Sequence, residues 1–196
     1  MTRGRLAIWN DCAPGHEAEY EAWYQGEHLV ERLGVPGFRL GRRFRAIEGT
    51  PEYFTYYEVD APEVLASPAY VERLENPTPA THRIMTQVFQ NMNRTVCTLA
   101  ASAGRHRGAF AVTSRLNKVP ALPGISAPDI ARVEAWKAAG TGPATSTEQR
   151  LRGEDDTIAA CLLVETLTEE AARRVAETMP GEVGIYRLLC SLAAEP

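Results

Sequence analysis

Hydrophobic residues recur with a helical period over residues 16–33, and the pattern ends abruptly at Gly34. The residues spaced for one side of this helix are Tyr20, Trp23, Tyr24, Glu27 and Glu31. Gly34 suits the left-handed position just beyond a helix end, and Pro36 cannot continue a helix. His28 lies at the margin of the aromatic side, about 80° around the helix from Tyr20. The pattern therefore predicts a helix that packs aromatic residues on a sheet, with an imidazole at the edge of that contact.

Apolar and alternating runs predict a complete set of strands and helices in the first half of the chain. Strands are predicted at residues 5–12, 38–47, 53–60 and 93–101, and a two-part helical region at 62–75 and 80–92. Asn76 and Pro77 separate the two helical parts. Thr78 is placed to cap the second part, with Pro79 in its first turn. With the helix at 16–33, the predicted order is β-α-β-β-α-β.

The same order is predicted a second time after a polar joint at residues 103–108. The predicted elements are strand 108–116, helix 129–139, strands 144–153 and 157–167, helix 169–179 and strand 185–193. Ser126 is the expected N-cap of the first of these helices, and Thr168 of the second. A β-α-β-β-α-β unit is typical of a ferredoxin-like module. The expected fold is therefore α+β, with two tandem modules at residues 1–104 and 105–196.

A ferredoxin-like module leaves one face of its sheet without helices. Two such faces on one chain bury each other most readily by packing sheet to sheet within that chain. The expected molecule is a monomer with this internal pseudo-dimer, or a homodimer. A cavity enclosed by such an arrangement is a natural site for a small molecule.

Composition narrows the classes of partner. Hydrophobic residues make up 44% and charged residues 23% of the 196 residues, which is ordinary for a globular protein. The net charge of −4 gives no electrostatic reason to bind nucleic acid or an acidic membrane. No apolar run approaches the ~20 residues that span a bilayer, and the N-terminal run is too short for a signal peptide. We expect a cytoplasmic protein with reduced cysteines, namely Cys12, Cys97, Cys161 and Cys190.

One motif in the first half resembles a known superfamily. The motif W-x₃-EH-x₇-PGF consists of Trp23, Glu27, His28, Pro36, Gly37 and Phe38. It resembles the dimeric α/β-barrel superfamily, in the branch related to ethyl tert-butyl ether degradation (EthD-like) proteins and to the methylmuconolactone methylisomerases. The resemblance covers residues 5–101 and implies a barrel-like pair of modules with His28 in the pocket, taking part in catalysis. The second half matches only in element order, which implies one site, in the first half.

His28 is the leading catalytic candidate on chemical grounds as well. An imidazole with a reference pKa of ~6.5 suits proton transfer at neutral pH. The alternative is a helix histidine bonded to a neighbouring carbonyl or to Glu27 or Glu31.

Six further residues are candidates for binding substrate. They are Trp9, Asp11, Trp23, Arg43, Tyr57 and His82. Asp11 follows the first strand and either orients His28 or forms a turn. An arginine facing the cavity would bind a carboxylate or enolate, and a tyrosine would donate a hydrogen bond. Adjacent strand residues face opposite ways, so Arg42 and Tyr56 compete with Arg43 and Tyr57. His82 lies on a helix, near the cavity rim or on the surface.

No motif points to a metal or nucleotide. The sequence has no HExxH motif, no Gly-rich phosphate loop and no GxSxG. The expected function is a cofactor-independent enzyme that uses acid/base catalysis on a carbonyl, lactone or aromatic polyketide-like substrate. The resemblance leaves isomerase, cyclase and cofactor-free monooxygenase open. The alternatives are a haem-binding protein of the same superfamily, with His28 or His82 as axial ligand, and a non-catalytic ligand-binding module.

Overall fold

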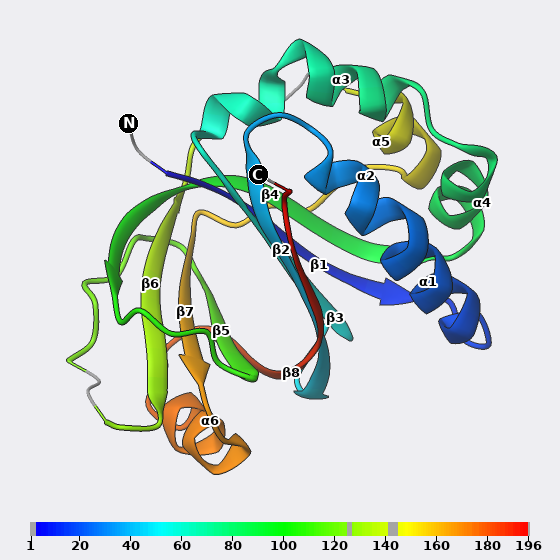
Figure 1. Cartoon of the computed structure of the whole chain (residues 1–196). Coiled ribbons are helices and arrows are strands. Elements are labelled where there is room, and N and C mark those ends of the chain that lie inside the picture. Colours follow the sequence, from blue (N-terminus) through cyan, green and yellow to red (C-terminus); the bar gives the residue numbers. More distant parts are fainter. Residues whose placement is uncertain (1–2, 125–126, 141–144, 196) are drawn as a thin grey trace.

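The computed structural model describes residues 3–124, 127–140 and 145–195. Eight antiparallel strands close into one barrel in the order β1-β3-β2-β8-β5-β7-β6-β4 (Figure 1). The strands are β1 (Gly4–Cys12), β2 (Phe38–Glu48), β3 (Tyr53–Val59), β4 (Phe89–Ala103), β5 (Phe110–Leu116), β6 (Ile130–Ala138), β7 (Ala160–Thr166) and β8 (Glu182–Ala193). Each strand has two neighbours, so closure leaves no strand edge exposed.

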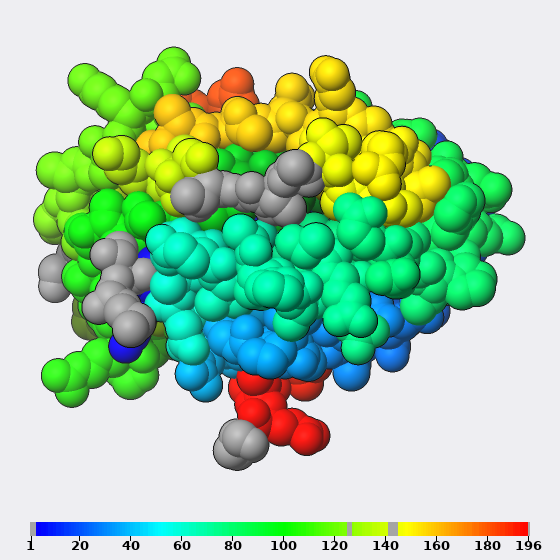
Figure 2. Space-filling model, turned by 90° about the horizontal axis from the view of Figure 1, so that it is seen from above, coloured from blue at the N-terminus to red at the C-terminus, as the bar shows by residue number. Residues whose placement is uncertain are grey.

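The helices lie outside the barrel in two unequal groups. They are α1 (Glu17–Trp23), η1 (Tyr24–His28), α2 (Leu29–Leu33), η2 (Pro62–Ala66), α3 (Pro68–Glu75), α4 (Pro79–Gln87), α5 (Thr147–Arg152) and α6 (Glu169–Ala176). α1 to α5 gather on one side and α6 lies alone on the other (Figure 1). The short helix α5 comes from the second half of the chain but packs against α3 and α4 of the first half. In Figure 2 the yellow α5 segment lies directly beside the teal α3–α4 segment.

Alternation along the strands separates the barrel interior from the helix layer. In β1, Ala7 and Trp9 belong to the interior cluster, whereas Leu6 and Ile8 pack under the helices. In β3, Tyr56 faces the interior and Tyr57 faces the helices. This period of two is the reason that adjacent residues of one strand serve two different cores.

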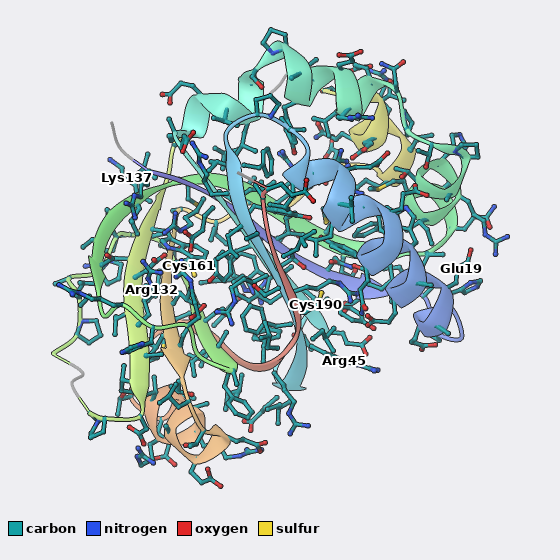
Figure 3. The ribbon with its side chains drawn as sticks, viewed as in Figure 1. Glu19, Arg45, Arg132, Lys137, Cys161 and Cys190 are labelled. Carbon is teal, nitrogen blue, oxygen red and sulfur yellow. The ribbon has the colours of Figure 1, made fainter. Side chains whose placement is uncertain are left out.

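Buried charges join the two halves at one end of the barrel. Glu134 accepts hydrogen bonds from Arg5 at 3.0 Å and from the Trp136 indole at 2.7 Å. Arg132, labelled in Figure 3, lies 2.6 Å from the same carboxylate. Glu165 pairs with Arg42 and accepts from the Tyr56 hydroxyl at 2.6 Å. Four arginines and three glutamates form this barrel-end charge cluster, which comprises Arg5, Arg42, Arg107, Arg132, Glu58, Glu134 and Glu165.

The strands and helices predicted for the first half are confirmed. Their ends differ from the prediction by a few residues, the largest differences being the earlier end of α4 at Gln87 and the earlier start of β4 at Phe89. The Thr78 hydroxyl accepts a hydrogen bond from the Thr81 amide at 3.0 Å, as expected of an N-cap.

The helix predicted at 129–139 is wrong, because this segment forms β6. Its alanines, glutamate and lysine favour a helix, but strand pairing with β4 and β7 outweighs that propensity. Arg132 and Glu134 were expected on a helix and instead face the barrel interior, where they pair with each other. The predicted cap Ser126 lies outside the described residues.

The strand predicted at 144–153 is also wrong, because residues 147–152 form α5. The Ser146 hydroxyl accepts from the Gln149 amide at 3.3 Å, and the following Glu-Gln-Arg-Leu-Arg run consists of strong helix formers. The second half therefore has the order β5-β6-α5-β7-α6-β8 rather than β-α-β-β-α-β. Residue 144 lies outside the described residues.

Two smaller expectations concern thiols and membranes. All four cysteines are free, three of them buried and Cys190 half-buried. Burial raises the pKa of Cys12 to about 11 and that of Cys97 to about 12. In the parts of the chain that the structure describes, every helix is too short or too polar to cross a bilayer.

Candidate functional site

A small, partly open cavity lies between the helix layer and the outer face of the barrel. Its lining residues are Leu6, Ile8, Tyr24, His28, Arg32, Tyr57, Tyr70, Leu74, Met85, Phe89, Met92, Arg94, Glu148 and Arg152. The space open to a water-sized sphere is about 20 Å³, which is room for one water molecule. The sequence offered two places for a ligand cavity, one between the two sheets and one between the first helix and the sheet at His28, and this cavity lies at the second.

A π-helical turn places His28 over this cavity. Residues 24–28 form one wide turn, in which the Leu29 amide donates to the Tyr24 carbonyl five residues back. The turn absorbs one extra residue, so His28 lies about 20° from Tyr20 around the helix instead of about 80°. His28 is only 5% exposed, so it belongs to the buried side of the helix rather than to its margin.

The surroundings of His28 keep its imidazole neutral. The ring lies 4.4 Å from the Trp23 ring and 5.1 Å from the Tyr24 ring, between centroids. Burial is the main reason that the pKa of His28 lies well below its usual value, and the charges of Arg32 and Arg152 lower it further. Within the described residues, its buried Nδ1 has no hydrogen-bond partner. A neutral imidazole with a free nitrogen can act as a general base, because it can accept a proton from a bound substrate.

Three arginines surround the same cavity. Arg32, one helical turn after His28, is 3% exposed and pairs with Glu148 of α5. Arg94 donates to the Tyr70 hydroxyl at 2.8 Å, and Arg152 lies 2.6 Å from Asp155. The lining thus carries three guanidinium groups and one carboxylate, which favours a ligand with negative charge.

Two tyrosines supply hydroxyl groups beside the imidazole. The hydroxyls of Tyr24 and Tyr57 lie 3.4 Å apart. Burial raises the pKa of each, so both keep their protons at neutral pH. Both are therefore able to donate a hydrogen bond to a developing oxyanion.

Trp23 of α1 and Arg43 of β2 lie between the first helix and the sheet, next to the residues that line the cavity. Trp23 contacts the His28 ring and donates through its indole to Thr81 at 3.1 Å. Arg43 is fully buried beside the rings of Tyr20, Tyr24 and Tyr53, and it pairs with Glu21. Its guanidinium already has an anion and aromatic partners, so its role here is to hold the first helix on β2.

Three predicted substrate-binding residues lie away from the cavity. Trp9 faces the barrel interior and stacks on Phe54, with 4.9 Å between ring centroids. The Asp11 carboxylate accepts from the Glu52 amide at 2.6 Å and from the Asn91 side chain at 2.7 Å, so it ties strand ends together. His82 is exposed on α4.

The charged residues of the lining were not among the predicted site residues. Arg32 could have been identified from the sequence as a site residue, since it lies four residues after His28 on the same helix face. Glu148 and Arg152 carried no usable signal, because their segment was predicted to be a strand. Arg94 lies in a strand whose register with β1 is set only by the fold.

Neither a metal nor haem fits the residues present. Among the described residues, no group of three His, Cys, Asp or Glu side chains converges as a metal site. The space beside His28 holds one water, and a haem macrocycle would need a far larger opening than a small aromatic ligand does. His82 is exposed on α4. No step of the reaction proposed below therefore runs through either group.

Comparison with solved structures identifies the fold. An anthrone oxidase-like protein matches with a TM-score of 0.58 at 10% identity, covering 100% of this chain and 94% of that one. A protein provisionally named as a monooxygenase, from Fusobacterium nucleatum, matches with a TM-score of 0.57 at 8% identity, covering 100% and 98%. A protein provisionally named as a chlorite dismutase matches with a TM-score of 0.59 at 11% identity, covering 97% and 96%.

These three proteins have the dimeric α/β-barrel fold, and so does this chain. The barrel fold that the motif around His28 implied is thereby confirmed. No protein-family model matches the chain. No curated protein sequence matches it either.

Proposed function

We propose that this protein is an enzyme in which neutral His28 acts as the general base on a small carbonyl-containing aromatic or lactone substrate. The supporting observation is the buried imidazole nitrogen without a partner in the described parts of the chain, next to the guanidinium of Arg32. The reaction needs neither metal nor nucleotide. The site lies in the first half of the chain, apart from the wall that α5 supplies.

His28 takes a proton from a carbon next to the substrate carbonyl, and the electrons of that C–H bond form an enolate. Arg32 stabilises the enolate oxygen by charge, and Tyr57 supplies a hydrogen bond. The low pKa of His28 makes it a weak base, so the matched substrate is one whose C–H bond is already acidic. A methylene group between aromatic rings and conjugated with a carbonyl has this property.

Three reactions begin with this proton transfer. In isomerisation the proton returns at another carbon, in cyclisation the enolate attacks a second carbonyl, and in oxidation it reacts with dioxygen. Oxidation of a methylene group balances as CH₂ + O₂ → C=O + H₂O. Among these we favour oxidation, because the matched structures include proteins named anthrone oxidase-like and monooxygenase.

Proton exchange tests the shared first step without knowledge of the final product. The protein is incubated anaerobically in D₂O with anthrone and with a panel of acidic ketones and lactones, and deuterium incorporation is measured by NMR. Wild-type protein is expected to exceed the buffer rate for at least one compound. His28→Gln is expected to lower that rate by about 10²–10⁴-fold, the usual contribution of general base catalysis.

His82→Gln is the matched control, because it removes an exposed imidazole that does not line the cavity. It is expected to leave the exchange rate unchanged. Equal rates in wild type and His28→Gln would refute the role of His28. Ligand binding without any exchange would instead support a non-catalytic binding module, and a Soret band in purified protein would support the haem alternative.

A further inference from the structure

We propose that Glu148 occupies the place of a substrate anion on Arg32, and that α5 is a displaceable wall which leaves when a flat carboxylate or enolate binds there. This rests on the proposed function only in assigning the ligand to the His28 cavity. It adds the substrate's charge, its binding residue and the route by which it enters.

The pairing of Arg32 requires an anion at this place. Its side chain is 3% exposed, and that of Glu148 is 4% exposed, so neither charge is solvated by bulk water. A buried guanidinium left without an anion is strongly destabilising. When Glu148 leaves, a second anion is therefore needed at the same position. Arg32 also retains a buried Nη1 that has no hydrogen-bond partner in the described parts of the chain.

The charge of the remaining walls favours an anionic ligand. Arg94 is bonded to the neutral Tyr70 hydroxyl, and Arg152 is balanced by Asp155. Glu148 is the one carboxylate among the lining residues that the structure describes. Without it the lining has an excess of positive charge from Arg32 and Arg94, which an anionic ligand would neutralise.

The size of the cavity requires that a wall move. About 20 Å³ admits one water, so a larger ligand enters only if the lining opens. The walls formed by β1, β3 and the first helix are fully buried, as Leu6, Tyr24 and Tyr57 show. The wall formed by α5 is six residues long and contributes half-buried Leu151 to the apolar core. Such an element opens at low free energy.

The outer attachments of α5 are weak. The Thr147 hydroxyl donates to Glu75 at 2.6 Å and Arg150 lies 3.2 Å from the same carboxylate, but these side chains are exposed. Exposed pairs of this kind contribute about 0–1 kcal/mol. The buried pair between Glu148 and Arg32 is thus the principal polar contact that holds α5 over the cavity, and a ligand anion competes with it directly.

Binding of 2-naphthoate and of its uncharged analogue 2-naphthamide, measured by calorimetry, tests the proposal. Glu148→Gln keeps the shape of the side chain and removes the competing charge. It is expected to tighten 2-naphthoate binding by about tenfold or more, with little change for 2-naphthamide. Arg32→Met is expected to abolish 2-naphthoate binding. Glu154→Gln, at an exposed carboxylate beyond α5, is the control and is expected to bind as wild type does.

Hydrogen exchange on the wild-type protein covers the case in which a variant fails to fold. Saturation with 2-naphthoate is expected to lower the protection of amides 147–152, while amides of β1 and β3 stay protected. Unchanged protection of α5 in the bound state overturns the displaceable wall. Equal effects of Glu148→Gln on the acid and the amide, or no effect on either, overturn the assignment of Arg32.

The two proposals fail separately. The His28→Gln variant is expected to bind 2-naphthoate, although it does not catalyse proton exchange. If binding follows Glu148 and Arg32 while no substrate exchanges protons, the proposed function fails and this inference stands. If proton exchange depends on His28 but Arg32→Met binds 2-naphthoate as tightly as wild type does, the inference fails and the proposed function stands.

Discussion

At the scale of single residues, His28 shows how burial sets chemistry. Its imidazole is enclosed by Trp23 and Tyr24 and lies near arginines, so the folded protein disfavours the protonated ring. A histidine at a helix C-terminus would have been expected to gain protons from the helix dipole. The helix continues through α2 to Leu33, as the sequence predicted, so His28 lies more than one turn before its C-terminus and burial dominates.

This environment predicts a pH dependence of stability. The pKa of His28 is lower in the folded than in the unfolded chain, so below about pH 6.5 the unfolded chain binds more protons. The contribution of His28 is thus fully present above that pH and is lost as the pH falls. The free energy of unfolding is expected to drop by up to about 1.4 kcal/mol per pH unit from this residue alone.

Urea denaturation at pH 7.5, 6.5 and 5.5 measures this slope. His28→Gln is expected to have a shallower pH dependence than wild type, whereas His82→Gln is expected to match wild type because His82 is exposed. Parallel curves for wild type and His28→Gln would show that the imidazole is not held neutral by the fold.

The sequence indicates only part of the site at this scale. His28 and Tyr57 line the cavity, and Trp23 covers the imidazole, because helix periodicity and strand alternation are local properties. Glu148 reaches Arg32 across 116 residues of sequence, and no local pattern reports such a contact. Trp9 and Asp11 were chosen because they end an apolar strand, but the face of a strand that meets the helices depends on the barrel.

At the scale of elements, the π-helical turn η1 decides which side of the first helix is buried. An ideal helix would place Glu27 and Glu31 with Tyr20, but both are half-buried while His28 and Arg32 are buried. The elements of the first half were predictable, since the apolar face of each helix and strand packs into a hydrophobic core, as its sequence pattern indicates. β6 was not, because its charged residues face inward and pair there.

Two glycines probe how this helix sits on the sheet. Gly26 lies exposed in η1, with open space where an added methyl group would stand, so Gly26→Ala is expected to raise the free energy of unfolding by about 0.5–1 kcal/mol. At Gly41 of β2, a Cβ would approach the Leu29 side chain to 2.6 Å and the Tyr57 ring to 3.0 Å. Gly41→Ala is expected to cost about 1–3 kcal/mol.

Chemical denaturation of both variants gives the comparison, and proton exchange catalysis gives the functional readout. Displacement of the helix in Gly41→Ala is expected to reduce catalysis, whereas Gly26→Ala retains it. A destabilised Gly26→Ala would mean that the wide turn itself requires glycine.

At the scale of the whole molecule, the barrel-end charge cluster joins the two halves. Arg42 comes from β2, and Glu165 comes from β7, which lies across the barrel interior. Tyr56 and the Gly108 amide complete the partners of the Glu165 carboxylate. The halves are therefore expected to unfold as one cooperative unit.

Removal of Glu165 tests this coupling. Glu165→Ala leaves Arg42 buried without its anion and is expected to cost about 3–5 kcal/mol. In a double-mutant cycle with Arg42→Met, the second substitution is expected to cost much less in the Glu165→Ala background than in wild type. Additive costs in urea denaturation, or two separate unfolding transitions, would show that the halves are not coupled through this pair.

Closure of the barrel within one chain has an evolutionary consequence. In a barrel made of two identical subunits, every substitution appears twice, so a helix that covers one cavity must also be present at the other. Here the two halves are encoded separately and drift apart independently. The second half can therefore carry α5 against α3 and α4 of the first half without any counterpart at its own end of the barrel.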